Sequence, residues 1–155
     1  MQLEFPKDFL WGSAASAHQV EGGNHNDWTE WEKETHHPIS GRACDHYNRF
    51  REDFDIAKSL NQNAYRFSIE WSRIEPEEGK FNEKEIAHYQ EVIDALRKRG
   101  IEPFVTLWHW TLPIWVAEQG GWENKKTIDD FARYAKKIVK SYPEEIDEAV
   151  DGGMN

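Results

Sequence analysis

The hydrophobic positions of this chain fall into short apolar runs and longer segments with helical spacing. An apolar run at 9–13 gives way to Gly, Ser and Ala, and the runs at 63–71 and 101–108 are rich in aromatic and β-branched residues. Apolar runs of this length and composition are typical of strands. The pattern therefore predicts three strands, the first with Phe9–Trp11 anchoring it in the core.

Three further segments carry apolar residues at spacings of three and four, which predicts helices with one buried face. The segments are 45–60, 82–100 and 127–142. The residues placed to cap their N-termini are Asp45, Asn82, and Thr127 with Asp130. In the last segment the expected buried side consists of Ile128, Phe131, Ala135, Ile138 and Tyr142.

The order of these elements alternates strand and helix, which favours parallel strands joined by crossover helices. Open doubly wound sheets and (β/α)8 barrels share this order. The first strand is followed by no G-x-G-x-x-G loop, so a nucleotide site and the open sheet are disfavoured. We therefore expect an α/β fold of the (β/α)8 barrel type, limited to about the first three βα units because a whole barrel needs about 250 residues.

Composition excludes several classes of function. The chain has 155 residues with 19 Lys and Arg against 29 Asp and Glu, a formal charge of -10. This charge repels nucleic-acid backbones and anionic membrane surfaces. No secretory signal or membrane-spanning apolar run is visible, and the single cysteine, Cys44, fits a reducing compartment. We expect a soluble cytoplasmic protein that needs no cofactor.

Polar residues and tryptophan follow each predicted strand, at the end where barrel enzymes place their functional side chains. They are His18, Gln19 and Glu21 after the first, Glu70 and Trp71 after the second, and His109 and Trp110 after the third. Gln19 and a neutral His109 can each donate and accept hydrogen bonds, as recognition of adjacent sugar hydroxyls requires. His18 and Glu21 are expected to support the turn that carries Gln19.

Structural alternatives stand beside these interpretations. Arg66 shares a strand face with Ala64 and Ser68, where it could close a structural ion pair, and His109 could be an ordinary core histidine. The eight tryptophans could fill a large-residue core or line a sugar-stacking cleft. A metal site at His25, His36–His37 and His46 is disfavoured, because their spacing matches no zinc pattern and solvated loop histidines explain them.

Three stretches then show a family resemblance. FLWGSAASAHQVEGG at 9–23, YRFSIEWSRIEP at 65–76 and TLWHWTLP at 106–113, followed by GGW at 120–122, resemble in order the motifs of glycoside hydrolase family 1. This family contains β-glucosidases and β-galactosidases. The resemblance implies that Gln19, His109 and Trp110 contact the innermost sugar, and that Arg66 holds the nucleophilic carboxylate ionised.

The implied reaction is hydrolysis of terminal β-glycosides with retention of configuration, which requires two carboxylates about 5 to 5.5 Å apart. The family keeps them in Asn-Glu-Pro and Glu-Asn-Gly motifs, and the chain contains neither. Asn82-Glu83-Lys84 and Glu123-Asn124-Lys125 resemble these motifs by accident and are rejected. We therefore expect no catalytic residue and no activity in this chain alone.

The expected organisation is a barrel portion over 1–142 and an acidic, disordered tail over 143–155. Three parallel strands leave open sheet edges, which predicts poor stability, self-association or a complementing chain. Two alternatives remain open: a non-catalytic sugar-binding or partner-binding module, and one half of a split enzyme.

Overall fold

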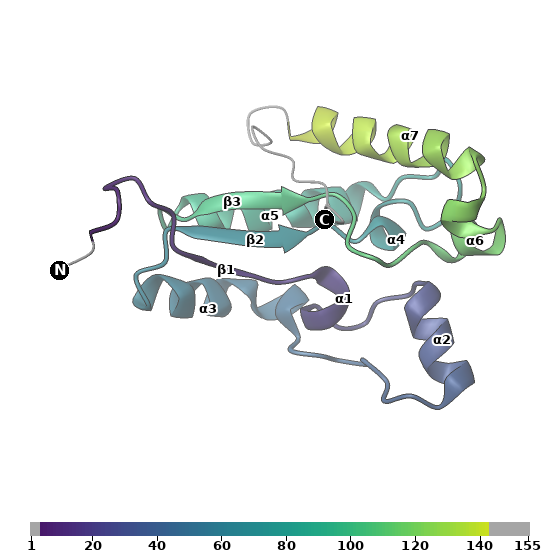
Figure 1. The fold of residues 1–155 in the computed structure, drawn as a ribbon, viewed down its shortest axis with the longest axis horizontal. Coiled ribbons are helices and arrows are strands. Elements are labelled where there is room, and N and C mark those ends of the chain that lie inside the picture. Colours follow the sequence, from purple (N-terminus) through teal and green to yellow (C-terminus); the bar gives the residue numbers. More distant parts are fainter. Residues whose placement is uncertain (1–3, 143–155) are drawn as a thin grey trace.

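The computed structural model describes residues 4–142, so the acidic segment 143–155 lies outside the described residues. The described residues form a three-stranded sheet in the order β1-β2-β3 (Figure 1). The strands are β1 Gly12–Ala14, β2 Ala64–Ser68 and β3 Glu102–Thr106. Both pairings are parallel, with Ala14 opposite Arg66 and Arg66 opposite Phe104. The predicted strand–helix alternation with parallel strands is confirmed.

Helices connect the strands and follow the last one. They are α1 Ala17–Val20, α2 Asp27–Thr35, α3 His46–Ser59, α4 Trp71–Ile74, α5 Glu83–Arg97, α6 Ile114–Glu118, η1 Gly121–Glu123 and α7 Lys126–Ser141. The three predicted helical segments correspond to α3, α5 and α7. Figure 1 shows α1, α4 and α6 gathered near the ends to which the strand arrows point. None of the helices within residues 4–142 is long and apolar enough to cross a bilayer.

The hydrophobic core lies between one face of the sheet and its helices. Phe67 and Val105 join Phe54 of α3 and Ile93 of α5 in one buried cluster. The other face of β2 carries Arg66, which is half-buried. The alternation of side chains along a strand therefore separates an apolar, helix-covered face from a partly exposed face that bears charge.

The first strand differs from its prediction. The apolar residues Phe9 and Trp11 are 40% and 50% exposed, and their rings contact each other and Phe5 in tilted and edge-on arrangements instead of entering the core. The strand is formed by the small residues that follow. An added Cβ on Gly12 would lie 2.3 Å from the carbonyl oxygen of Ala64, so only glycine permits this close pairing of β1 with β2.

Of the predicted caps, Asn82 and Asp45 both lie at the N-cap position of their helices, but only Asn82 makes the capping hydrogen bond. Asn82 accepts a hydrogen bond from the backbone N–H of Lys84 and caps α5. Asp45 precedes α3 but makes no capping hydrogen bond, because its carboxylate binds Arg42 and Asn48. Thr127 lies inside α7 and donates its hydroxyl to the carbonyl of Gly121, so the predicted cap there is wrong.

The buried side of α7 also differs in part. Ile128 is 64% exposed, whereas Ile138 and Tyr142 are buried as expected. Tyr134, which the prediction did not include, is completely buried and donates its hydroxyl to the carbonyl of Leu107. Part of the contact between α7 and the sheet is therefore the hydrogen bond of the Tyr134 hydroxyl, which the spacing of apolar residues does not predict.

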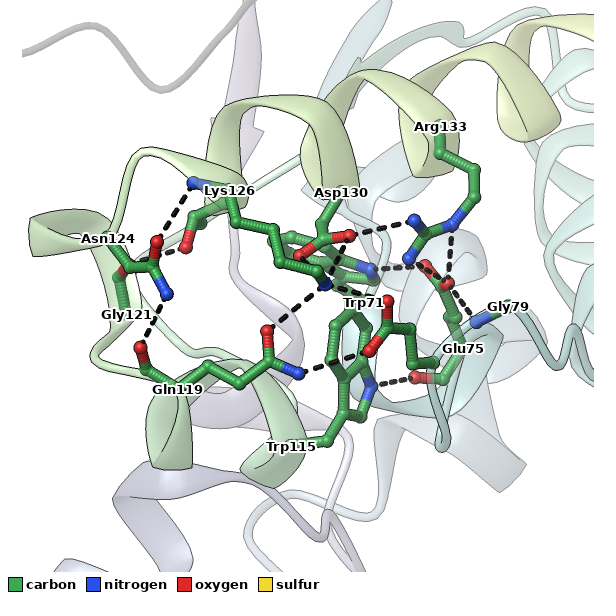
Figure 2. Close-up of polar contacts among 12 residues, drawn as sticks. Trp71, Glu75, Gly79, Trp115, Gln119, Gly121, Asn124, Lys126, Asp130 and Arg133 are labelled. Carbon is green, nitrogen blue, oxygen red and sulfur yellow. Dashed lines mark hydrogen bonds and ion pairs between the residues drawn. The ribbon is translucent and has the colours of Figure 1, made fainter.

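An ion pair between a buried carboxylate and a partly exposed arginine joins α7 to the end of α4, as Figure 2 shows. Glu75 has no exposed surface, and its carboxylate accepts hydrogen bonds from Arg133 Nη2 at 2.6 Å and Trp71 Nε1 at 3.0 Å. The backbone N–H of Gly79 donates to it as well. Arg133 also binds the buried Asp130 at 2.8 Å. We call Glu75, Arg133 and Asp130 the α4–α7 clamp.

Candidate functional site

The candidate site lies at the carboxyl ends of the three strands, where parallel strands present their following residues at one rim. Gln19 comes from α1 after β1, and His109 and Trp110 come from the loop after β3. Arg66 lies within β2, between these two segments. The topology therefore brings all four predicted site residues to the same end of the sheet.

Arg66 and His109 are in direct contact. Arg66 Nη1 lies 3.1 Å from His109 Nδ1. A guanidinium can only donate, so His109 Nδ1 must accept, and the ring proton belongs on Nε2. Burial and the Arg66 charge lower the pKa of His109. The imidazole is thus neutral at pH 7, with an N–H left to donate to a ligand.

Arg66 has no carboxylate partner within residues 4–142. The structural ion pair that the sequence left open for it is not formed there, and His109 is the side chain it meets. His109 is half-buried at the rim, so the alternative of an ordinary core histidine is also wrong. A half-buried cation without a counter-charge has strong capacity to hold an anionic group.

Trp110 has an unusual backbone. Its φ is 78°, in the left-handed region, and the N–H of Thr111 donates to the carbonyl of His109 across it at 3.0 Å. This is a tight γ-turn with a non-glycine residue at its centre, which costs about 1 to 3 kcal/mol. The turn leaves the indole 57% exposed, so a flat apolar surface faces outward beside His109.

Gln19 is exposed on α1 and lies within a local hydrogen-bond arrangement. Its Oε1 accepts a hydrogen bond from the hydroxyl of Ser16 at 2.9 Å. The backbone N–H of Ala17, the residue after Ser16, donates to the hydroxyl oxygen of Ser68 at 2.8 Å. The α1 turn is thereby fixed to the end of β2. Within the described chain no hydrogen bond joins Gln19 to His109, so the two remain separately available.

Beneath the rim, buried polar residues hold the loops in place. His18 lies between Glu32 Oε1 at 3.1 Å and Asn26 Nδ2 at 3.2 Å. Asn26 reaches Glu70, which also accepts from Thr111. These contacts connect all three post-strand segments. Asn26 and Thr111 escaped the sequence analysis because their importance depends on partners 44 and 41 positions away.

A second buried group sits behind the α1 turn. Glu21 is 5% exposed, pairs with Arg73 Nε at 2.9 Å and accepts from the hydroxyl of Tyr89 at 2.8 Å. Burial outweighs the charge of Arg73 and raises the pKa of Glu21 from 4.5 to about 7. The contacts of His18 and Glu21 are those expected of residues that support this turn.

The raised pKa of Glu21 predicts a pH effect on stability. The folded chain favours the protonated carboxyl, so this contribution to stability is complete below pH 4.5 and is lost as pH rises through about 7. In urea unfolding at about pH 5 and about pH 7.5, the original chain should lose about 2 kcal/mol more between the two pH values than Glu21→Gln loses. Parallel pH profiles of the two proteins would contradict the assignment.

Glycines next to Glu21 shape the same loop. Gly22 has a φ of 79°, and an added Cβ would lie 2.0 Å from the carbonyl oxygen of Arg42, whereas Gly23 has a φ of 65° and free space. Gly23→Ala should therefore cost only the left-handed strain, about 1 kcal/mol. Gly22→Ala should cost about 2 kcal/mol more in urea unfolding. Equal losses would show that the backbone contact is unimportant.

The remaining residues that the sequence analysis discussed lie away from the rim or at exposed positions outside it. Trp71 is 1% exposed and stacks on Tyr134 in the core, so it is not a rim residue. Glu83 begins α5 and Glu123 ends η1, and both are exposed. Tryptophans occur both in the core and at exposed positions, including Trp28 at 40%.

The four loop histidines that the sequence raised as metal ligands differ in their surroundings. Within residues 4–142 no group of three or more His, Cys, Asp or Glu side chains is arranged to hold a metal ion. His25 is exposed, as expected of a loop histidine. His46 is not solvated as expected: it is 7% exposed and its Nδ1 lies 2.6 Å from Asp53.

The three parallel strands, with helices between them and a polar rim at their carboxyl ends, are those of an incomplete (β/α)8 barrel. The model of glycosyl hydrolase family 1 matches residues 1–151, and the chain belongs to this family.

Several relatives support this assignment. The chain is 41% identical to Beta-glucosidase A of Acetivibrio thermocellus over 151 residues, which cover 90% of this chain and 34% of the relative. Beta-glucosidase A of Thermotoga maritima is 40% identical over 154 residues, which cover 92% of this chain and 34% of the relative. The chain therefore spans about a third of the length of these curated relatives.

Solved structures agree. A beta-glycosidase from Pyrococcus horikoshii matches with a TM-score of 0.87 and 44% identity, covering 92% of this chain and 34% of its own. The Thermotoga maritima beta-glucosidase in complex with castanospermine matches with a TM-score of 0.90 and 37% identity, covering 94% and 36%. The predicted fold class, an incomplete barrel of about three βα units, is confirmed.

Proposed function

We propose that the chain contributes part of the glycone-binding site of a retaining β-glycosidase, one that hydrolyses terminal β-linked sugars. The observation that carries this proposal is the contact of Arg66 with His109. It leaves a neutral imidazole with a free Nε2–H beside the exposed indole of Trp110. Donor groups next to an aromatic surface suit a sugar, which offers hydroxyls at its edge and C–H groups on its face.

Each rim residue has a separate role in this proposal. Gln19 and His109 bind adjacent hydroxyls of the innermost sugar, and Trp110 packs against the ring. Arg66 holds the nucleophilic Glu in its charged form, a role supported by the lack of a carboxylate partner for it within residues 4–142. One Glu would attack the anomeric carbon while a second protonates the leaving oxygen and later activates water. Neither motif for these glutamates occurs in the chain.

The chain is therefore proposed to be inactive by itself and to work with further strands. The open edges of β1 and β3 could take a complementing polypeptide or a second copy of this chain. The need for further strands is supported by the relatives, which are about three times as long as this chain. A cytoplasmic location belongs to the proposal and rests on the single cysteine, Cys44, which is exposed.

Calorimetric titration of the isolated chain with glucose tests whether the rim is an incomplete site. The incomplete site should give no saturable heat at millimolar glucose. Millimolar binding by a monomeric, cooperatively unfolding chain would instead favour the non-catalytic sugar-binding module. Co-purification from the native source with a chain that bears Asn-Glu-Pro and Glu-Asn-Gly would identify a split enzyme.

A further inference from the structure

His46, the first residue of α3, carries an unpartnered buried atom. Its Nδ1 lies 2.6 Å from a carboxylate oxygen of Asp53. The carboxylate accepts this hydrogen bond, which places a ring proton on Nδ1 and leaves Nε2 to meet a separate partner. Nε2 is buried and meets no donor among the described residues. Buried acceptors in folded proteins are nearly always satisfied, so this atom requires a partner.

The space beside His46 limits what that partner can be. A small cavity of about 10 Å³ lies where α1, α3, β2 and α5 meet, and its lining includes His46, Ser68 and Ser16. This room is about what one water molecule occupies. A sugar, an inorganic anion or a side chain from another molecule would not fit.

A donor faces the same cavity. Ser68 is 3% exposed, and its Oγ accepts the N–H of Ala17 at 2.8 Å. The hydroxyl proton of Ser68 has no acceptor within the described chain. The cavity lining thus includes two buried side chains with bonding capacity to spare: His46 through Nε2 and Ser68 through its hydroxyl proton. A water molecule can complement both at once, because it donates and accepts.

We propose that this cavity is a binding site for one structural water, which donates to His46 Nε2 and accepts from the hydroxyl of Ser68. The water joins the start of α3 to the end of β2. Since Ser68 also holds the N–H of Ala17, the bridge extends to the turn that presents Gln19. The site does not depend on sugar binding or on the proposed reaction.

A crystal structure of the unmodified chain provides the first test. An ordered oxygen is expected within about 3.2 Å of His46 Nε2. An empty cavity, or a ring turned so that Nε2 meets a protein donor, would overturn the proposal.

Water relaxation dispersion in solution provides the second test. His46→Phe fills the space of the imidazole but has no Nε2, and we expect it to lose one long-lived water relative to the original chain. His25→Phe, at an exposed loop position, is the matched control and should keep the full number. Equal numbers of long-lived waters in the original chain and His46→Phe would refute the site.

Discussion

The 155-residue chain by itself should fail to hydrolyse an aryl β-glucoside, and activity should appear when the remaining strands are supplied. The rim binds and positions, but bond cleavage in this family of reactions requires two carboxylates that the sequence does not contain. Loss of both removes the chemistry itself, so the expected effect is at least a millionfold in rate. The measurement is nitrophenol release by protein purified free of host glycosidases.

Adding the missing strands back tests the same prediction from the opposite direction, because activity should then return. Residues 1–142 would be co-expressed with the part of Thermotoga maritima Beta-glucosidase A that follows its matched region, and activity should return. Gln19→Ala in this assembly should lower kcat/KM about tenfold or more, the cost of one or two lost hydrogen bonds to the substrate. Gln62→Ala, at the opposite end of the strands, should have no effect. Turnover by the chain alone would disprove the proposed dependence on a partner.

The second large effect is expected at the α4–α7 clamp. Arg133→Met keeps the length of the side chain but leaves the completely buried Glu75 without its cation. Trp71 Nε1 and the N–H of Gly79 still donate to Glu75, but they carry no charge. Breaking a buried pair in this way costs about 4 kcal/mol. The urea midpoint should fall by about 2 M.

An exposed pair provides the control for the clamp. Lys80 and Glu77 are 71% and 67% exposed and form a surface ion pair. Lys80→Met should leave the urea midpoint unchanged within error, because solvent screens such pairs. If the two variants behaved alike, the clamp would contribute no more than a surface ion pair.

The sequence predicted some elements well because their signals are local. β2 and β3 alternate large side chains between two faces, and α5 has both a cap at Asn82 and a regular apolar face. The first strand was displaced because apolar character at Phe9 suggests burial, whereas pairing depends on the absence of a side chain at Gly12. The pattern of apolar residues does not predict where two backbone segments come this close together.

At the candidate site, too, the sequence predicted the local features but not the contacts between distant segments. Strand order and facing were enough to place Gln19, Arg66 and His109 at one rim. The sequence did not reveal that Arg66 meets an imidazole instead of a carboxylate, because that contact depends on the loop conformation after β3. Thr127 likewise has a capping residue type, but a neighbouring carbonyl, that of Gly121, takes its hydroxyl. Contacts across loops are set by tertiary geometry.

The left-handed backbone at Trp110 has a consequence for protein engineering. Glycine would relieve the strain there, so selection for thermal stability alone should drift toward replacing this tryptophan. The same replacement would delete the exposed aromatic surface next to His109. Libraries built to stabilise this segment should therefore hold position 110 fixed, or be screened for sugar recognition together with heat resistance.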